Sequence, residues 1–94
     1  LIYASSVYVE PDNVEISEIK PQWNGKSVTV DGNVSQPYMT KGNLFFSLED
    51  SSGSVKVAEF GSNKTLESGT DVTVTGRVTL YRGSLEVIAD RIQK

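Results

Sequence analysis

The chain of 94 residues contains no cysteine and no histidine. The absence of cysteine excludes a disulfide framework, a thiolate zinc site and a cysteine nucleophile. The absence of histidine removes the most common metal ligand and the most common general base. Glu49 and Asp50 do not form a carboxylate pair, because neighbouring strand residues point to opposite faces, and we interpret them as turn residues. We therefore predict that the protein is not an enzyme and has no catalytic residue, metal or cofactor.

Long apolar runs are also missing, since no stretch reaches the roughly 18–20 apolar residues that a membrane helix needs. The chain begins with Leu1 rather than Met, so we expect a fragment or a processed product. Residues 1–4, Leu-Ile-Tyr-Ala, are apolar or aromatic and carry no charge. They fit the end of a removed signal or membrane anchor, or else a short added strand or frayed terminus. A chain without cysteine fits either side of a membrane, so the localisation stays open between cytoplasmic and membrane-tethered.

Positive charge is scarce, because 9 Lys and Arg residues stand against 12 Asp and Glu residues, a net charge of −3. The imbalance lies at the N-terminus. Residues 1–19 carry four acids and no base, a net of −4, and residues 20–94 carry nine bases and eight acids, a net of +1. A nearly neutral body argues against a tight, salt-sensitive binder of phosphates, but it is compatible with a ligand held by stacking.

Alternating apolar and polar residues predict an all-β domain. The expected strands cover residues 27–34, 44–48, 55–60, 71–80 and 84–92. A short helical turn is expected within 14–20, ended by Pro21, and a loop over 35–43. The residues expected to point outward are Thr29, Phe45, Lys56, Ala58, Thr73, Thr75, Arg77 and Thr79. In the fifth strand Leu85, Val87 and Ala89 lie on one face but Ile88 and Ile92 on the other, which predicts either a bulge or a strand covered on both sides. The predicted organisation is an N-terminal arm (1–13) followed by one domain (14–94).

Two strands share a pattern that predicts barrel closure. Val28-Thr-Val-Asp-Gly-Asn-Val34 is echoed by Val72-Thr-Val-Thr-Gly-Arg-Val78, each with a glycine in mid-strand. Such a glycine marks a bulge, a sharp bend or close backbone approach. Two long valine strands bent at Gly32 and Gly76 favour a small closed barrel, in which one strand serves both sides. The alternative is a duplicated hairpin in an open sheet.

The ordered set of these segments resembles the OB-fold family of nucleic-acid-binding domains. The resemblance covers residues 14–92 and is carried by Ile16-Ser-Glu-Ile-Lys-Pro21, the two valine strands, Gly42-Asn-Leu-Phe-Phe-Ser-Leu-Glu-Asp50, Gly53-Ser-Val-Lys-Val57 and Tyr81-Arg-Gly-Ser-Leu-Glu-Val87. The most similar groups are archaeal replication-protein-A-like single-strand binders, anticodon-binding-type domains and the N-terminal domain of the exonuclease VII large subunit. The resemblance implies a five-stranded Greek-key barrel. Residues 61–69 leave room for at most one turn of the helix that usually joins the third and fourth strands.

The resemblance also implies a ligand face on the second and third strands and two flanking loops. Its candidate residues here are aromatic or basic: Tyr38, Lys41, Phe45, Lys56, Phe60, Tyr81 and Arg82, with Met39 beside them. The aromatic rings would stack on bases and the cations would meet phosphates.

Each candidate also has a structural interpretation. Tyr3 or Tyr8 of the arm would cover Phe45, Tyr81 would cap the barrel end, and the basic residues would be solvated surface charges. Trp23 is expected to plug the bottom of the barrel.

The main functional hypothesis is therefore binding of single-stranded DNA or RNA at modest affinity. The alternative is a protein-interaction or adaptor module, tethered to a membrane through a segment upstream of residue 1.

Overall fold

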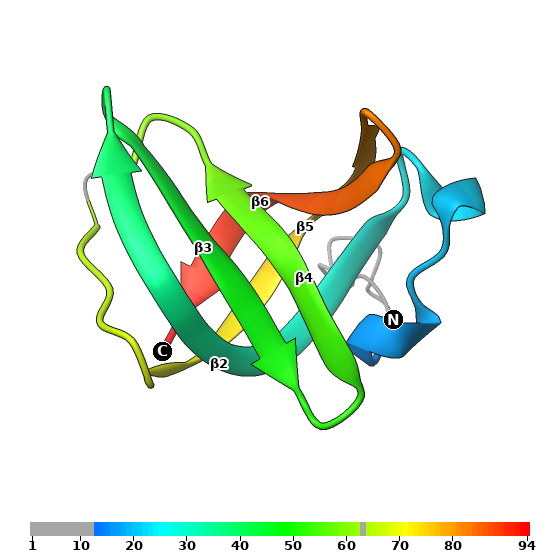
Figure 1. The fold of residues 1–94 in the computed structure, drawn as a ribbon, viewed down its shortest axis with the longest axis horizontal. Helices are drawn as coiled ribbons and strands as arrows, with labels where there is room; N and C mark the ends of the chain where they lie inside the picture. The colour runs from blue at the N-terminus through cyan, green and yellow to red at the C-terminus, as the bar shows by residue number, and fades with distance from the viewer. Residues whose placement is uncertain (1–12, 63) are drawn as a thin grey trace, which may run out of the picture.

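The computed structural model describes residues 13–62 and 64–94, in which five strands close into one barrel (Figure 1). The strands are β2 (Ser27–Thr40), β3 (Asn43–Asp50), β4 (Gly53–Glu59), β5 (Asp71–Tyr81) and β6 (Ser84–Gln93). Their order around the barrel is β2-β3-β4-β6-β5, and only the β4–β6 pair is parallel. The predicted five-stranded OB-fold barrel is confirmed. No helix within the described ranges is long and apolar enough to span a membrane.

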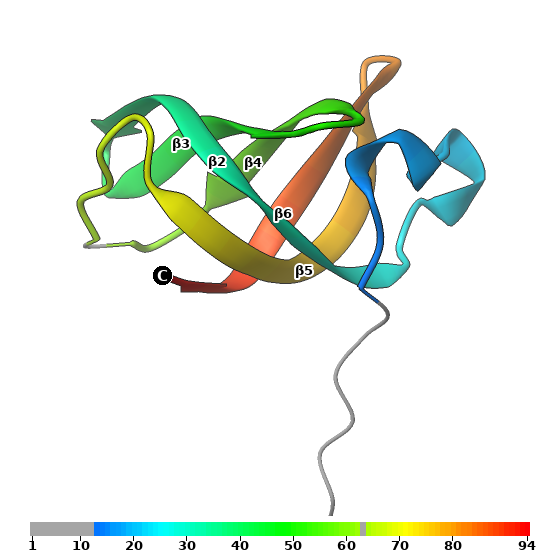
Figure 2. The same ribbon diagram turned by 90° about the horizontal axis from the view of Figure 1, so that it is seen from below.

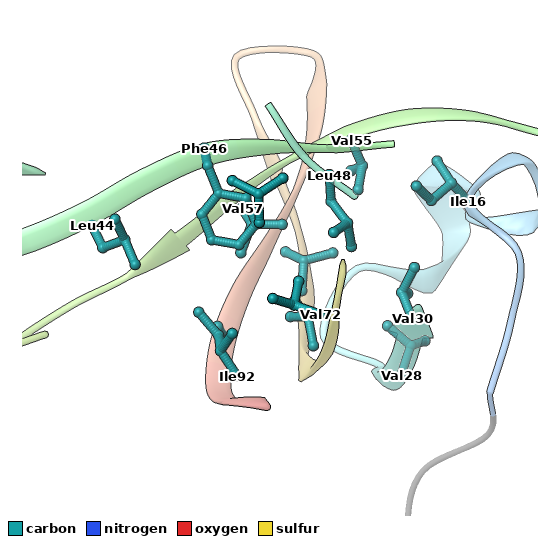
Figure 3. Packing of buried hydrophobic residues seen from close by; sticks show 14 of the residues in the cluster. Ile16, Val28, Val30, Leu44, Phe46, Leu48, Val55, Val57, Val72 and Ile92 are labelled. Atoms are coloured by element: carbon teal, nitrogen blue, oxygen red, sulfur yellow. The ribbon is translucent and has the colours of Figure 1, made fainter. Parts of the chain in front are cut away.

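The core fills the barrel with the apolar residues that alternate along the strands (Figure 3). Val28, Val30 and Val34 of β2 are fully buried, as are Val74 and Val78 of β5. Apolar residues of β3, β4 and β6 meet them in the interior: Leu44, Phe46, Leu48, Val55, Val57, Val87, Ala89 and Ile92. The valine strands therefore face the interior as their alternation predicts.

Close backbone contact explains both mid-strand glycines. A Cβ atom on Gly32 would lie 2.8 Å from the Glu49 carbonyl oxygen, and one on Gly76 would lie 2.9 Å from the Ala89 Cα and would also strike the Ile88 carbonyl oxygen. Gly76 also borders a register shift, where Thr75 pairs with Arg91 and Gly76 with Ala89. The extra residue of β6 is Asp90, so the bulge predicted in the fifth strand is confirmed.

The predicted loop over residues 35–43 is wrong, because β2 continues to Thr40. The register shifts between Ser35, opposite Ser47, and Tyr38, opposite Phe45, which leaves one extra residue on β2. Gln36 adopts a positive φ of 54° at this bulge. Pro37 cannot donate a ladder hydrogen bond, and a bulge is where a strand tolerates it. The connection to β3 shrinks to Lys41 and Gly42.

Three side chains expected to point outward are nevertheless buried, namely Thr29, Thr75 and Ala58. The Thr29 and Thr75 hydroxyls lie 3.3 Å apart on neighbouring strands. The segment at Asn13 runs beside them, since Asn13 bridges to Thr29 and the Val14 N–H donates to the Thr29 carbonyl. Ala58 is small and lies directly opposite Phe45 on β3. Alternation predicts the direction of a side chain but not what lies over it.

Two short 3-10 turns, η1 (Ile16–Glu18) and η2 (Pro21–Trp23), precede the barrel. The predicted turn within 14–20 is found as η1, and Pro21 also starts η2. Trp23 is half-buried against the core cluster, and the Lys26 Nζ lies 4.6 Å from its ring centroid. Between β4 and β5, the described residues form no helix.

Asp50 joins η1 to the β3–β4 turn. One carboxylate oxygen accepts hydrogen bonds from the Ser52 N–H (2.7 Å), the Ser52 hydroxyl (2.6 Å) and the Gly53 N–H (3.0 Å). The other accepts one from the Ile16 N–H at 3.0 Å. Desolvation raises the pKa of the Asp50 carboxyl, but these hydrogen bonds together outweigh it and leave the pKa below its ordinary value. Asp50 ends β3 and caps the turn, whereas the prediction of a turn residue is wrong for Glu49, which lies within β3 opposite Ser54.

Gly76→Ala should lower the free energy of unfolding by about 1–3 kcal/mol, because the added methyl group would strike backbone atoms of β6. Gly53→Ala is the matched control, since its Cβ would meet only the Ile16 Cγ2 at an ordinary 3.7 Å. Urea unfolding of both variants measures the difference. Equal stability of the two variants would contradict the role given to Gly76.

The Asp50 carboxylate should make the domain acid-sensitive. Because its pKa is lower in the folded state, its stabilisation is present above the unfolded pKa and is lost as the pH falls through the folded pKa. Urea unfolding of the wild type and of Asp50→Asn should therefore differ at pH 7 and converge below about pH 4. A difference that stays constant down to pH 2 would show that the charge is not responsible.

Candidate nucleic-acid interface

Three aromatic side chains gather on the outer face of β2 and β3 and at the end of β4. Tyr38 and Phe45 are directly opposite in the β2–β3 ladder, and their rings stack at 5.3 Å between centroids with 24° between planes. Phe60 follows β4 and meets the Phe45 ring edge-on, with 6.3 Å between centroids. Tyr38 and Phe60 are 59% and 58% exposed, so part of each ring is accessible at the surface of the described residues. The structure thus brings together three of the predicted site residues.

A groove of about 410 Å³ lies beside this aromatic cluster. Tyr38 and Phe45 line it together with Ala58 and Lys56 of β4. This volume falls within the roughly 300–1,000 Å³ of typical small-ligand sites. The predicted Lys56 therefore belongs to the same surface as the rings.

Lys41 lies at one end of this surface, in the two-residue turn between β2 and β3, and has a φ of 53°. The turn is braced by the segment after β4, because the Ser62 N–H donates to the Gly42 carbonyl at 2.9 Å and the Gly61 N–H donates to the Asn43 side chain at 3.1 Å. Lys41 is exposed, and Met39 alternates to the other side of β2 from Tyr38, where it is 43% exposed.

Tyr81 and Arg82 form a separate group on the β5–β6 hairpin. Tyr81 is 54% exposed, and the Arg82 guanidinium carbon lies 5.2 Å from its ring centroid. Among the described residues, no ring contact joins Tyr81 to the aromatic cluster. Figure 1 shows the hairpin and the β2–β3 turn at opposite ends of the upper edge, and Figure 2 shows the hairpin rising on the side of β3 and β4. The hairpin therefore flanks the face without completing the cluster.

The groove also contains polar residues that were not predicted, namely Gln36, Ser47 and Glu86. Gln36 was missed because the candidates were limited to aromatic and basic residues. Glu86 reaches the groove because β6 lies parallel to β4, with Glu86 opposite Lys56. The parallel pairing expected of an OB-fold barrel is the signal that could have located it.

A second hollow, of about 500 Å³, is acidic: Asp31, Glu49, Asp50 and Asp71 line it, together with Lys94. Carboxylates repel phosphates, so this hollow does not suit a nucleic-acid backbone. Across residues 13–62 and 64–94, no group of three metal-ligating side chains comes together. The arm residues Tyr3 and Tyr8, expected over Phe45, lie outside the described residues.

The sequence profile of the family "OB-fold nucleic acid binding domain" matches residues 9–93. The chain therefore belongs to this family of nucleic-acid-binding domains, and its five-stranded closed barrel is the fold of that class.

Among individual proteins, the chain is similar to the exodeoxyribonuclease 7 large subunit of Clostridium beijerinckii, with 34% identity over 76 residues. That match covers 72% of this chain but only 19% of the subunit's length.

Solved structures share the fold. Asparaginyl-tRNA synthetase from Pyrococcus horikoshii superposes with a TM-score of 0.76 and 26% identity, over 85% of this chain and 22% of that one. The second OB-fold domain of replication protein A from Methanococcus maripaludis superposes with a TM-score of 0.69 and 22% identity, over 85% of this chain and 91% of that one. The resemblance that the sequence shows to exonuclease VII large subunits, anticodon-binding-type domains and replication-protein-A-like domains is confirmed.

Proposed function

We propose that this domain binds single-stranded DNA or RNA on the outer face of β2, β3 and β4, and that it acts as a binding module without catalysing a reaction. The observation that carries the proposal is the stacked Tyr38–Phe45 pair, with Tyr38 exposed beside an open groove. Unpaired bases present flat faces that stack on such rings, which is worth about 1–3 kcal/mol per base. Bases within a duplex are already stacked on each other and cannot reach the rings.

The charges fit a strand that is held mainly by its bases. Lys41 and Arg82 lie at the two ends of the face, and Lys56 lies between them. Three cations give limited electrostatic attraction, so we expect modest affinity and a shallow dependence on salt. The similarity to an exodeoxyribonuclease subunit favours a role in which the domain holds a DNA strand for a larger protein.

Phe45→Ala and Tyr38→Ala should each weaken the binding of a labelled oligonucleotide by about 1–3 kcal/mol, or roughly 5- to 150-fold, because each removes a stacking surface. Fluorescence titration at low salt measures the effect. Met39→Ala is the control, because Met39 is on the same strand and exposed but faces away from Tyr38. No binding by the wild type at tens of micromolar protein would overturn the proposed function.

Lys41→Ala and Arg82→Ala should each reduce the slope of log K against log salt concentration by about 0.7, the value for one lost phosphate contact with a single strand. Arg77→Ala provides the control, since Arg77 is exposed on β5, which Figure 2 shows on the opposite side of the barrel from β3. Titrations at several salt concentrations give the slopes. An equal change for all three variants would place the phosphate contacts elsewhere.

A further inference from the structure

Two rows of side chains cross the groove side by side. The first row, called the aromatic row, contains the rings of Tyr38 and Phe45 and ends at the small side chain of Ala58; the three residues are paired across β2, β3 and β4. The polar row contains Ser47, Lys56 and Glu86, which are paired across β3, β4 and β6. The rows are two residues apart on β3 and β4, or about 7 Å at the usual rise of a strand. The edge of a base stacked in the first row would therefore face the second row.

The polar groups of the second row are free to bind a ligand. Within the described part of the chain, no hydrogen bond or ion pair occupies the Lys56 ammonium or the Glu86 carboxylate, although the two residues are cross-strand partners. Their opposite charges cancel, which makes this row a poor site for a phosphate. A neutral partner with both donors and acceptors, such as the edge of a base, suits it better.

We propose, on the basis of the function proposed above, that this row recognises one guanine base. The Watson–Crick edge of guanine presents an acceptor, O6, followed by two adjacent donors, N1–H and N2–H. Lys56 supplies only donors, and the Glu86 carboxylate supplies two acceptor oxygens. If the Lys56 ammonium donates to O6 and the Glu86 carboxylate accepts from N1–H and N2–H, every polar group on the guanine edge has a hydrogen-bond partner. This assigns Lys56 to a base rather than to a phosphate.

The other bases complement the row less well. Uracil and thymine offer N3–H to one carboxylate oxygen but place the O2 acceptor against the other, which is repulsive. Adenine and cytosine present a single amino group on this edge and lack the adjacent pair of donors. A matched bidentate contact discriminates by about tenfold or more between the right and the wrong base.

The test is fluorescence anisotropy of the 94-residue chain with an oligothymidine and with the same oligonucleotide carrying one central guanosine, inosine, adenosine or cytidine. The guanosine oligonucleotide should bind about tenfold more tightly than the oligothymidine. Inosine lacks the N2 amino group and should lose most of this gain. Glu86→Gln places a donor against guanine and should bring the preference within about threefold, while oligothymidine binding stays unchanged.

Equal binding of the guanosine, inosine and thymidine oligonucleotides would overturn the guanine assignment and leave the proposed function intact. A guanosine preference that persists in Glu86→Gln would overturn it as well. If no oligonucleotide binds, both the proposed function and the guanine site fail. Should Glu86→Gln not fold, the comparison of guanosine with inosine on the wild type still decides, because it changes only the ligand.

Discussion

The fold depends on how closely backbones approach at Gly32 and Gly76. At both positions the neighbouring strand lies where a Cβ atom would be, so any other residue would push the strands apart. This contact lets β2 pair with β5 along its first half and with β3 along its second half. The barrel closes as a result, and its outer surface at β2, β3 and β4 becomes curved and continuous. The aromatic row and the polar row both belong to that surface.

The interior and the ligand face place opposite demands on the same strands. On β3, Leu44, Phe46 and Leu48 fill the core while Phe45 and Ser47 face the groove. The buried residues fix the register, and the register fixes which outward residues become neighbours. Tyr38 meets Phe45 only because the bulge at Gln36 restores the pairing beyond Pro37. The site thus depends on core packing although none of its rings belongs to the core cluster.

Much of this arrangement could be predicted from alternation and from the two glycines. The strands, the barrel, the bulge in β6 and the outward direction of Phe45 and Lys56 are local properties of the sequence. The extension of β2 could not be predicted, because Pro37 and Gly42 signal a loop unless a bulge accommodates the proline. Glu86 was missed for another reason: its neighbour Lys56 is 30 positions away and is reached only through the parallel β4–β6 pairing. Long-range pairing leaves no mark in a short stretch of sequence.

The two-residue turn between β2 and β3 has a consequence for how quickly the proposed nucleic-acid strand would bind and dissociate. A turn this short, tied down by the segment after β4, cannot fold over a bound strand. On the proposed function, a strand would enter this site sideways at any internal position, without threading a free end. Because this turn forms no lid, the proposed site would also release its ligand quickly, and its occupancy would follow the local concentration of the strand. Within a longer protein that grips the same strand elsewhere, short linkage raises that concentration to about millimolar, enough to fill a weak site.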